Sequence, residues 1–87
     1  MNIMPYFVYI LRSLQDGTYY VGSTQNLEER IERHNQGRSK FTKVKRPWKL
    51  VYREEFAERS SAMKRESEIK RHKRITFIDQ LVRTSRM

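Results

Sequence analysis

The 87-residue sequence contains no cysteine, one tryptophan, three glycines and only two histidines, His34 and His72. The lack of cysteine excludes disulfides and thiolate metal sites, and two histidines are too few for an all-nitrogen zinc site. Any metal bound by this chain is therefore expected to be a hard cation with oxygen ligands.

Long hydrophobic runs are also lacking. No apolar segment approaches the roughly 20 residues that a membrane-spanning helix needs, and the start, MNIMPYFVYIL, has no basic region or cleavage site of a signal peptide. We expect a cytoplasmic protein with one domain over residues 1–87 and a modest core of two packed layers.

Acidic residues are outnumbered, since 19 Lys and Arg stand against ten Asp and Glu, for a net charge of +9. Such a surface suits a polyanion, because each phosphate contact releases condensed counterions. We expect DNA as the partner, RNA as an alternative, and no membrane role; the competing interpretation is that the charge only keeps a small protein soluble. The expected phosphate contacts come from one basic segment: Arg38, Lys40, Lys43, Lys45, Arg46 and Lys49.

The order of residue types predicts an α/β fold, a small three-stranded antiparallel sheet flanked by about three helices. Residues 6–13 and 18–23 are rich in β-branched and aromatic types and are joined by a turn at LQDG, which is typical of a hairpin. Residues 48–56, WKLVYREEF, predict the third strand, and the basic segment before it predicts a loop.

Capping residues predict where the helices begin. Asn26, followed three residues later by Glu29, indicates a capping box for a helix that ends near Gln36, before Gly37. Ser60 or Ser61 is expected to cap a second helix that runs to about His72. The motif TFID resembles another capping box and predicts a short C-terminal helix over about 76–84.

Polar residues interrupt the apolar faces of the first two helices. Arg30 and His34 share the i, i+3, i+4, i+7 face of Leu27 and Ile31, and Glu66 lies within the only apolar stripe of the second helix. Arg30 and His34 either lie at the edge of the stripe and reach water, or they serve a site. Glu66 needs a cation, for which Arg30 and a divalent metal are equal candidates.

Two strand tyrosines, Tyr9 and Tyr20, are explained by β-propensity alone as packing residues. They share a sheet face if the hairpin loop holds an even number of residues, because side chains alternate along a strand. If the two tyrosines share one face with Arg30, His34 and Glu66, an active site is favoured over simple packing.

The motifs FVYIL, YVGST, NLEERIERHNQG, PWKLVY and SAMKRESEIKR follow each other over nearly the whole chain. Their order and spacing resemble the GIY-YIG nuclease superfamily, in particular small stand-alone bacterial members related to the N-terminal domain of the excision-repair nuclease UvrC. The sequence differs from the family pattern at Phe7 and Val8, where the first motif has Gly and Ile, and no asparagine follows Asn35.

The resemblance implies a metal-dependent endonuclease that hydrolyses DNA, structure-specifically, in repair or processing; the alternative is a nucleic-acid-binding module with little or no cutting. It implies one Mg²⁺ or Mn²⁺ on Glu66 as Lewis acid, with Arg30 on the phosphate. A tyrosine that takes the proton of the water needs a positive field, which Arg30 and the metal would supply. The implied catalytic residues are Tyr9, Tyr20, Arg30, His34 and Glu66, and the sequence does not say which tyrosine is the base.

Overall fold

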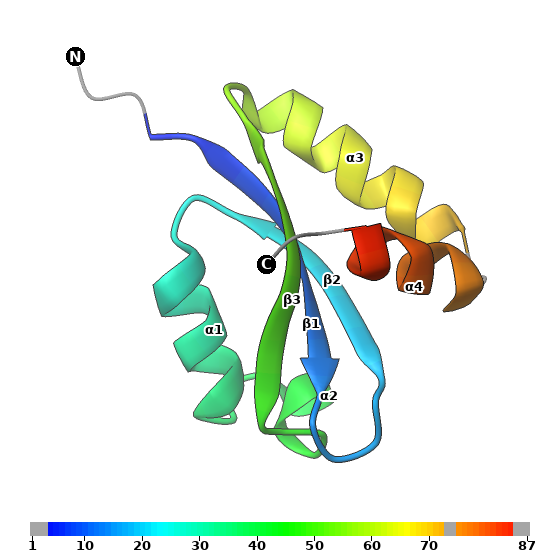
Figure 1. Ribbon diagram of the computed structural model, residues 1–87. Helices are drawn as coiled ribbons and strands as arrows, with labels where there is room; N and C mark the ends of the chain where they lie inside the picture. Colours follow the sequence, from blue (N-terminus) through cyan, green and yellow to red (C-terminus); the bar gives the residue numbers. More distant parts are fainter. Residues whose placement is uncertain (1–3, 73–74, 85–87) are drawn as a thin grey trace.

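The computed structural model describes residues 4–72 and 75–84 of the chain (Figure 1). Within these residues, the strands are β1 (Tyr6–Ser13), β2 (Tyr19–Thr24) and β3 (Trp48–Phe56), and the helices are α1 (Leu27–Asn35), α2 (Lys40–Lys43), α3 (Arg59–Arg71) and α4 (Ile75–Thr84). The strands form an antiparallel sheet in the order β2-β1-β3, so that β2 is an edge strand. The predicted α/β fold with a three-stranded antiparallel sheet is confirmed.

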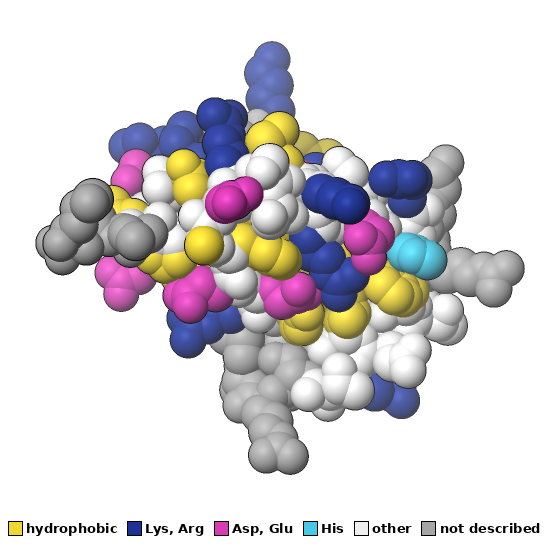
Figure 2. All heavy atoms as spheres, turned by 90° about the horizontal axis from the view of Figure 1, so that it is seen from above, with side chains coloured by type: hydrophobic (Ala, Val, Ile, Leu, Met, Phe, Trp, Pro, Cys, Tyr) yellow, Lys and Arg dark blue, Asp and Glu magenta, His cyan; other side chains and the backbone are white. Residues whose placement is uncertain are grey.

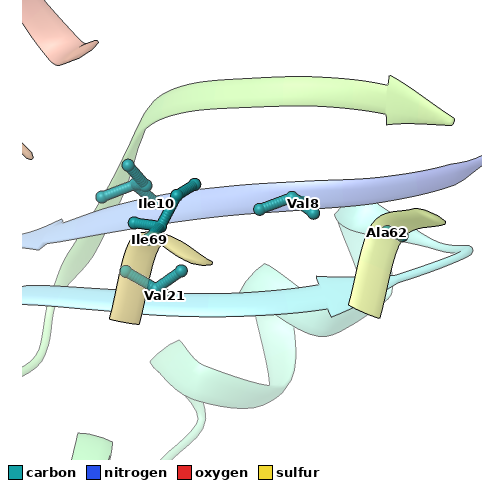
Figure 3. Packing of buried hydrophobic residues seen from close by; sticks show 5 residues of the cluster. All are labelled: Val8, Ile10, Val21, Ala62 and Ile69. Carbon is teal, nitrogen blue, oxygen red and sulfur yellow. The ribbon is translucent and has the colours of Figure 1, made fainter. Parts of the chain in front are cut away.

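Helices cover both faces of this sheet, with α1 on one side and α3 and α4 on the other (Figure 1). The α3 side is an aliphatic core formed by Val8, Ile10, Val21, Ala62 and Ile69 (Figure 3). The α1 side is more aromatic, and its buried residues are Tyr9, Leu11 and Trp48. Each fully buried Val, Leu or Ile side chain contributes about 1.5–3 kcal/mol, so these two layers stabilise the elements that carry the site.

The register of the β1–β2 hairpin decides which tyrosines share a face. Ser13 N–H donates to the Thr18 carbonyl at 2.8 Å, which leaves the four residues 14–17 as the turn. Gly17 takes a φ of +78° in that turn, a conformation that glycine adopts without strain. Tyr9 pairs with Gly22, and the even loop puts Tyr9 and Tyr20 on the same face, as the sequence allowed.

Several local predictions were wrong. The expected loop after Gly37 contains the one-turn helix α2, closed by a 2.9 Å hydrogen bond from Lys43 N–H to the Ser39 carbonyl, so the described chain has four helices. Neither Ser60 nor Ser61 caps α3, because Glu58 already holds the N-cap position.

The capping box of the last helix was also placed wrongly, because α4 begins at Ile75 and Thr76 lies inside it. At α1 the N-cap was correct: the Asn26 side chain accepts from Glu29 N–H at 3.1 Å. The carboxylate of Glu29, however, meets the side-chain amide of Asn26 rather than its backbone N–H. Among the described residues, no helix combines the length and apolarity that crossing a membrane requires.

Candidate functional site

A buried chain of hydrogen bonds joins β1, α1 and α2. The Oη atom of Tyr9 lies 3.2 Å from Nε2 of His34, and Nδ1 of the same imidazole lies 2.9 Å from Oγ1 of Thr42. The three side chains belong to residues that are 1%, 5% and 0% exposed, respectively. A neutral imidazole donates at one nitrogen and accepts at the other, and a hydroxyl can do either, so Tyr9 and Thr42 satisfy both nitrogens and fix the orientation of the ring.

The charge states in this chain follow from burial. Burial lowers the pKa of His34 below its ordinary value of 6.5, and the nearby charges of Arg30 and Arg33 lower it further, so the imidazole is neutral at pH 7. Burial likewise raises the pKa of the Tyr9 phenol, with Tyr20 adding to the effect. The positive field of Arg30 acts in the expected direction on Tyr9, but burial outweighs it.

Gly22 permits the close approach of β2 to Tyr9. A Cβ atom at this position would lie 2.5 Å from Oη and 2.7 Å from Cζ of Tyr9. Any side chain here would displace the phenol from His34, so the glycine serves the placement of the hydrogen-bond chain.

An arginine-rich cleft of about 180 Å³ opens beside His34. Its walls are Tyr20, Arg30, Arg33, His34, Arg38 and Ser39. The ring of Tyr20 is half-buried and its centroid lies 4.7 Å from that of His34. Three arginines line this small space, and a guanidinium group binds an oxyanion such as phosphate with paired hydrogen bonds.

Glu66 lines a second cleft of about 430 Å³, whose other charged walls are Arg30 and Arg59. Its carboxylate accepts a 2.6 Å hydrogen bond from Ser23 Oγ and a 2.5 Å contact from Lys70 Nζ. The glutamate side chain is 20% exposed. Among the residues that the structure describes, the cation that pairs with this carboxylate is Lys70 and not Arg30.

The five predicted site residues come together at the edge strand β2 rather than on one sheet face. Tyr9, Tyr20, Arg30 and His34 gather on the α1 side, as the shared helix face and the hairpin register predicted. Glu66 belongs to α3, which covers the opposite face (Figure 1), and it contacts the same edge strand through Ser23. Arg30 connects the two halves, because it is a wall of both clefts.

Glu66 is the one carboxylate that lines its cleft among the described residues, so a divalent cation bound there would keep most of its waters. Within the described part of the chain, no three His, Asp or Glu side chains gather into a metal-binding group. Mg²⁺ commonly keeps several waters and uses one or two carboxylates together with substrate phosphates. The Glu66–Lys70 pair is an i, i+4 surface pair worth about 0.3–0.5 kcal/mol, so a cation can displace it.

The basic residues of the chain differ in whether they pair with an acidic side chain. Lys45 pairs with Asp16 at 2.8 Å, and this bond holds the pKa of that carboxyl well below its usual range. Arg38, Lys40, Lys43, Arg46 and Lys49 are exposed. Seen from above, the α3 side carries acidic and basic side chains next to each other (Figure 2). Arg65 pairs there with Glu54 and Glu68, so this face is mixed rather than uniformly basic.

Sequence reasoning missed three residues that contact the site. Thr42 orients His34, Arg33 adds a guanidinium to the smaller cleft, and Ser23 holds Glu66. Arg33 had a signal, since it follows Arg30 by three residues on the same helix. Ser23 and Thr42 had none, because their partners lie 43 and 8 residues away and are brought together by the fold.

Comparison with known proteins agrees with the fold. Residues 5–77 match the GIY-YIG catalytic domain, a nuclease family, and the chain belongs to this family. Among its relatives are small bacterial proteins named UPF0213. One from Staphylococcus saprophyticus is 42% identical over 86% of this chain and 95% of its own length. Another from Staphylococcus aureus is 46% identical over 79% of this chain and 84% of its own.

A solved structure supports the same assignment. The solution NMR structure of a UPF0213 protein from Bacillus halodurans is 35% identical and superposes with a TM-score of 0.57. The match covers 91% of this chain and 83% of that protein. The likeness to this family therefore holds for the three-dimensional arrangement of the sheet and its helices as well as for the sequence.

Proposed function

We propose that the protein is a metal-dependent endonuclease that hydrolyses phosphodiester bonds of DNA, structure-specifically, in repair or processing. One observation carries this proposal: Arg30 is a shared wall of the cleft that holds Glu66 and of the cleft that holds Tyr20 and His34. A phosphate bound by Arg30 lies between a carboxylate able to hold a cation and two groups able to position a water. The family membership supports the same reaction class.

The chemistry follows from what each side chain can do. Hydrolysis forms a bond from a water oxygen to phosphorus, breaks the bond to the 3′ oxygen, and moves a proton from the water to the leaving group or solvent. Arg30 offsets the charge that develops on the phosphate, with Arg33 and Arg38 beside it. Glu66 would hold the divalent cation, which would supply Lewis-acid stabilisation of the departing oxygen.

The two tyrosines take different roles in this proposal. Tyr9 is almost fully buried and bonded to His34, and burial raises its pKa, so it positions the imidazole. Tyr20 is half-buried and lines the arginine-rich cleft, so its hydroxyl is the one that contacts the attacking water. Tyr20→Phe is accordingly expected to reduce cutting with little effect on folding, whereas Tyr9→Phe perturbs both.

The proposal is tested by incubating the protein with supercoiled plasmid and with branched, single-stranded and duplex oligonucleotides, in Mg²⁺, Mn²⁺ or EDTA. We expect cutting that requires metal and falls by about 100-fold or more in Arg30→Lys and Glu66→Gln. Glu68→Gln is the matched control, since it makes the same chemical change two residues away on α3 and outside both clefts. Cutting that survives Glu66→Gln undiminished would contradict the proposal.

A nucleic-acid-binding module without cutting is the second candidate, and one observation favours it. Both oxygens of the Glu66 carboxylate already have partners within the chain, Ser23 and Lys70. If they exclude a cation, the arginine-rich cleft binds phosphate without hydrolysis. Affinity that falls steeply with salt, combined with no cutting under any metal condition, identifies this function.

A further inference from the structure

A groove of about 450 Å³ runs beside the edge strand β2, and most of the residues that line it have no part in the reaction proposed above. It lies next to the arginine-rich cleft, and Tyr20 is a wall of both. Its volume falls within the range of about 300–1,000 Å³ found for small-molecule sites. The groove brings together residues of β2, α2, α3 and α4, among them Tyr19, Tyr20, Phe41, Ile69, Lys70 and His72.

The walls of this groove are aromatic and partly open to solvent. Phe41 is 57% exposed, although burying an aromatic side chain is favourable, and its ring centroid lies 6.1 Å from that of Tyr20. His72, another wall of the groove, stacks on Phe77 with ring centroids 4.2 Å apart. Flat π surfaces of this kind bind nucleobases of any sequence by stacking.

The charges around the groove are positive and favour an anionic ligand. Lys70 is a wall of the groove, and Lys40 and Lys43 flank Phe41 on the same short helix. A second copy of the chain would bring one net charge of +9 against another, which opposes pairing along the free edge of β2. A ligand with an aromatic ring on an anionic backbone would stack on the aromatic walls and pair with the lysines.

We propose that this groove binds an unpaired nucleobase next to the phosphate held by Arg30, so that the substrate is a nucleic acid with single-stranded character at that point. The inference rests on the proposed function. A base paired within a duplex has both faces stacked on its neighbours, and it reaches the groove only when it is unpaired. Phe41 and Tyr20 form the stacking surface, and Lys70 contacts the adjoining phosphate.

The test measures binding in EDTA, where no cutting interferes, by fluorescence anisotropy. The probes are a labelled single strand, the corresponding duplex, and a strand of the same length in which every base is replaced by an abasic spacer. We expect the base-containing strand to bind at least about five-fold more tightly than the abasic strand, as stacking of one base provides. Deoxyribose and ribose versions of the strands separate DNA from RNA as the source.

Phe41→Ala is expected to remove most of this difference, and Phe41→Trp to keep it. Val44→Ala is the matched control, since Val44 directly follows α2, is 68% exposed and does not line the groove. Methyl NMR with a thymidine monophosphate probe should shift Ile69 and Ile78 signals and leave Ile31, on the α1 side, unchanged.

The outcomes separate this inference from the proposed function. Equal affinity for the base-containing and abasic strands would refute base binding in the groove. It would leave the proposed phosphate site unaffected. Binding of an acidic peptide with the same dependence on Phe41 also overturns it, since the groove would then be a peptide site. Failure to bind any strand refutes both proposals, because no phosphate would be held beside Arg30.

Discussion

The contact between Gly22 and Tyr9 makes Gly22→Ala a sensitive test of how the site is packed. In an open strand, alanine is favoured over glycine by roughly 0.5–1 kcal/mol, because it has less backbone freedom to lose. Here the added carbon would lie 2.7 Å from Cζ of Tyr9, whereas carbon atoms pack best at about 3.5–4.0 Å. Overpacking of a buried site costs about 1–3 kcal/mol, so the clash outweighs the gain.

Movement of the Tyr9 ring relieves this clash only by lengthening the 3.2 Å contact with His34. A typical hydrogen bond contributes about 0.5–1.5 kcal/mol, and this one would be strained or lost. We therefore expect Gly22→Ala to lower the free energy of unfolding by about 1–3 kcal/mol, measured by urea denaturation. In a protein of this size each 1 kcal/mol shifts the Tm by about 4–8 °C.

The control is the same substitution in a Tyr9→Leu background. Leucine lacks the ring atoms that the new methyl group would meet, so Gly22→Ala should there be neutral or stabilising. A double-mutant cycle should give a coupling of at least about 1 kcal/mol between the two positions. Additive effects, or a stabilising Gly22→Ala in the otherwise unchanged protein, would refute the role given to Gly22.

The remaining predictions concern the polar residues around α1. Thr42→Val, which leaves His34 Nδ1 without its 2.9 Å partner, should cost about 1–3 kcal/mol and shift the Nδ1 signal in ¹⁵N NMR, whereas Thr42→Ser should preserve both the stability and the signal. The pKa of His34 is lowered from 6.5 in the folded protein, so the unfolded chain binds the proton first as the pH falls. The free energy of unfolding should therefore decline below about pH 6.5. This pH dependence should disappear in His34→Gln and persist in His72→Gln. Asn26→Ala removes the bond to Glu29 N–H and should cost about 1 kcal/mol in urea unfolding, while Asn26→Asp keeps most of the stability.

The sequence was sufficient for features that depend on local residue types. The bounds of β1 and β3 were predicted as observed, because β-branched and aromatic residues filled 6–13 and 48–56 between turn signals. The N-cap at Asn26 was equally clear, since its side chain needs only a backbone group three residues away. The shared face of Tyr9 and Tyr20 followed once the turn was known to contain four residues.

Features that depend on the arrangement of layers were not accessible in this way. Helical periodicity showed that Glu66 faced inward, but it did not show that α3 covers the sheet face opposite to α1. The helix α2 was likewise predicted as a loop, because its segment is mostly basic. Lys40 and Lys43 are exposed, while Thr42 between them is buried against His34. The role of Thr42 arises from packing, which no pattern within its own segment encodes.

The position of the site at the edge strand has a physical reason. A chain of 87 residues buries only a modest core and leaves no room for a deep cleft within one layer. At the β2 edge, α1 and α3 project from opposite faces and form walls without opening the core. The α1 half is set by buried hydrogen bonds, whereas Glu66 is held by the solvent-exposed Lys70 and by Ser23. In the function proposed above, the half fixed by buried hydrogen bonds would bind the phosphate, and the half in which Lys70 pairs with Glu66 would exchange that lysine for a metal ion.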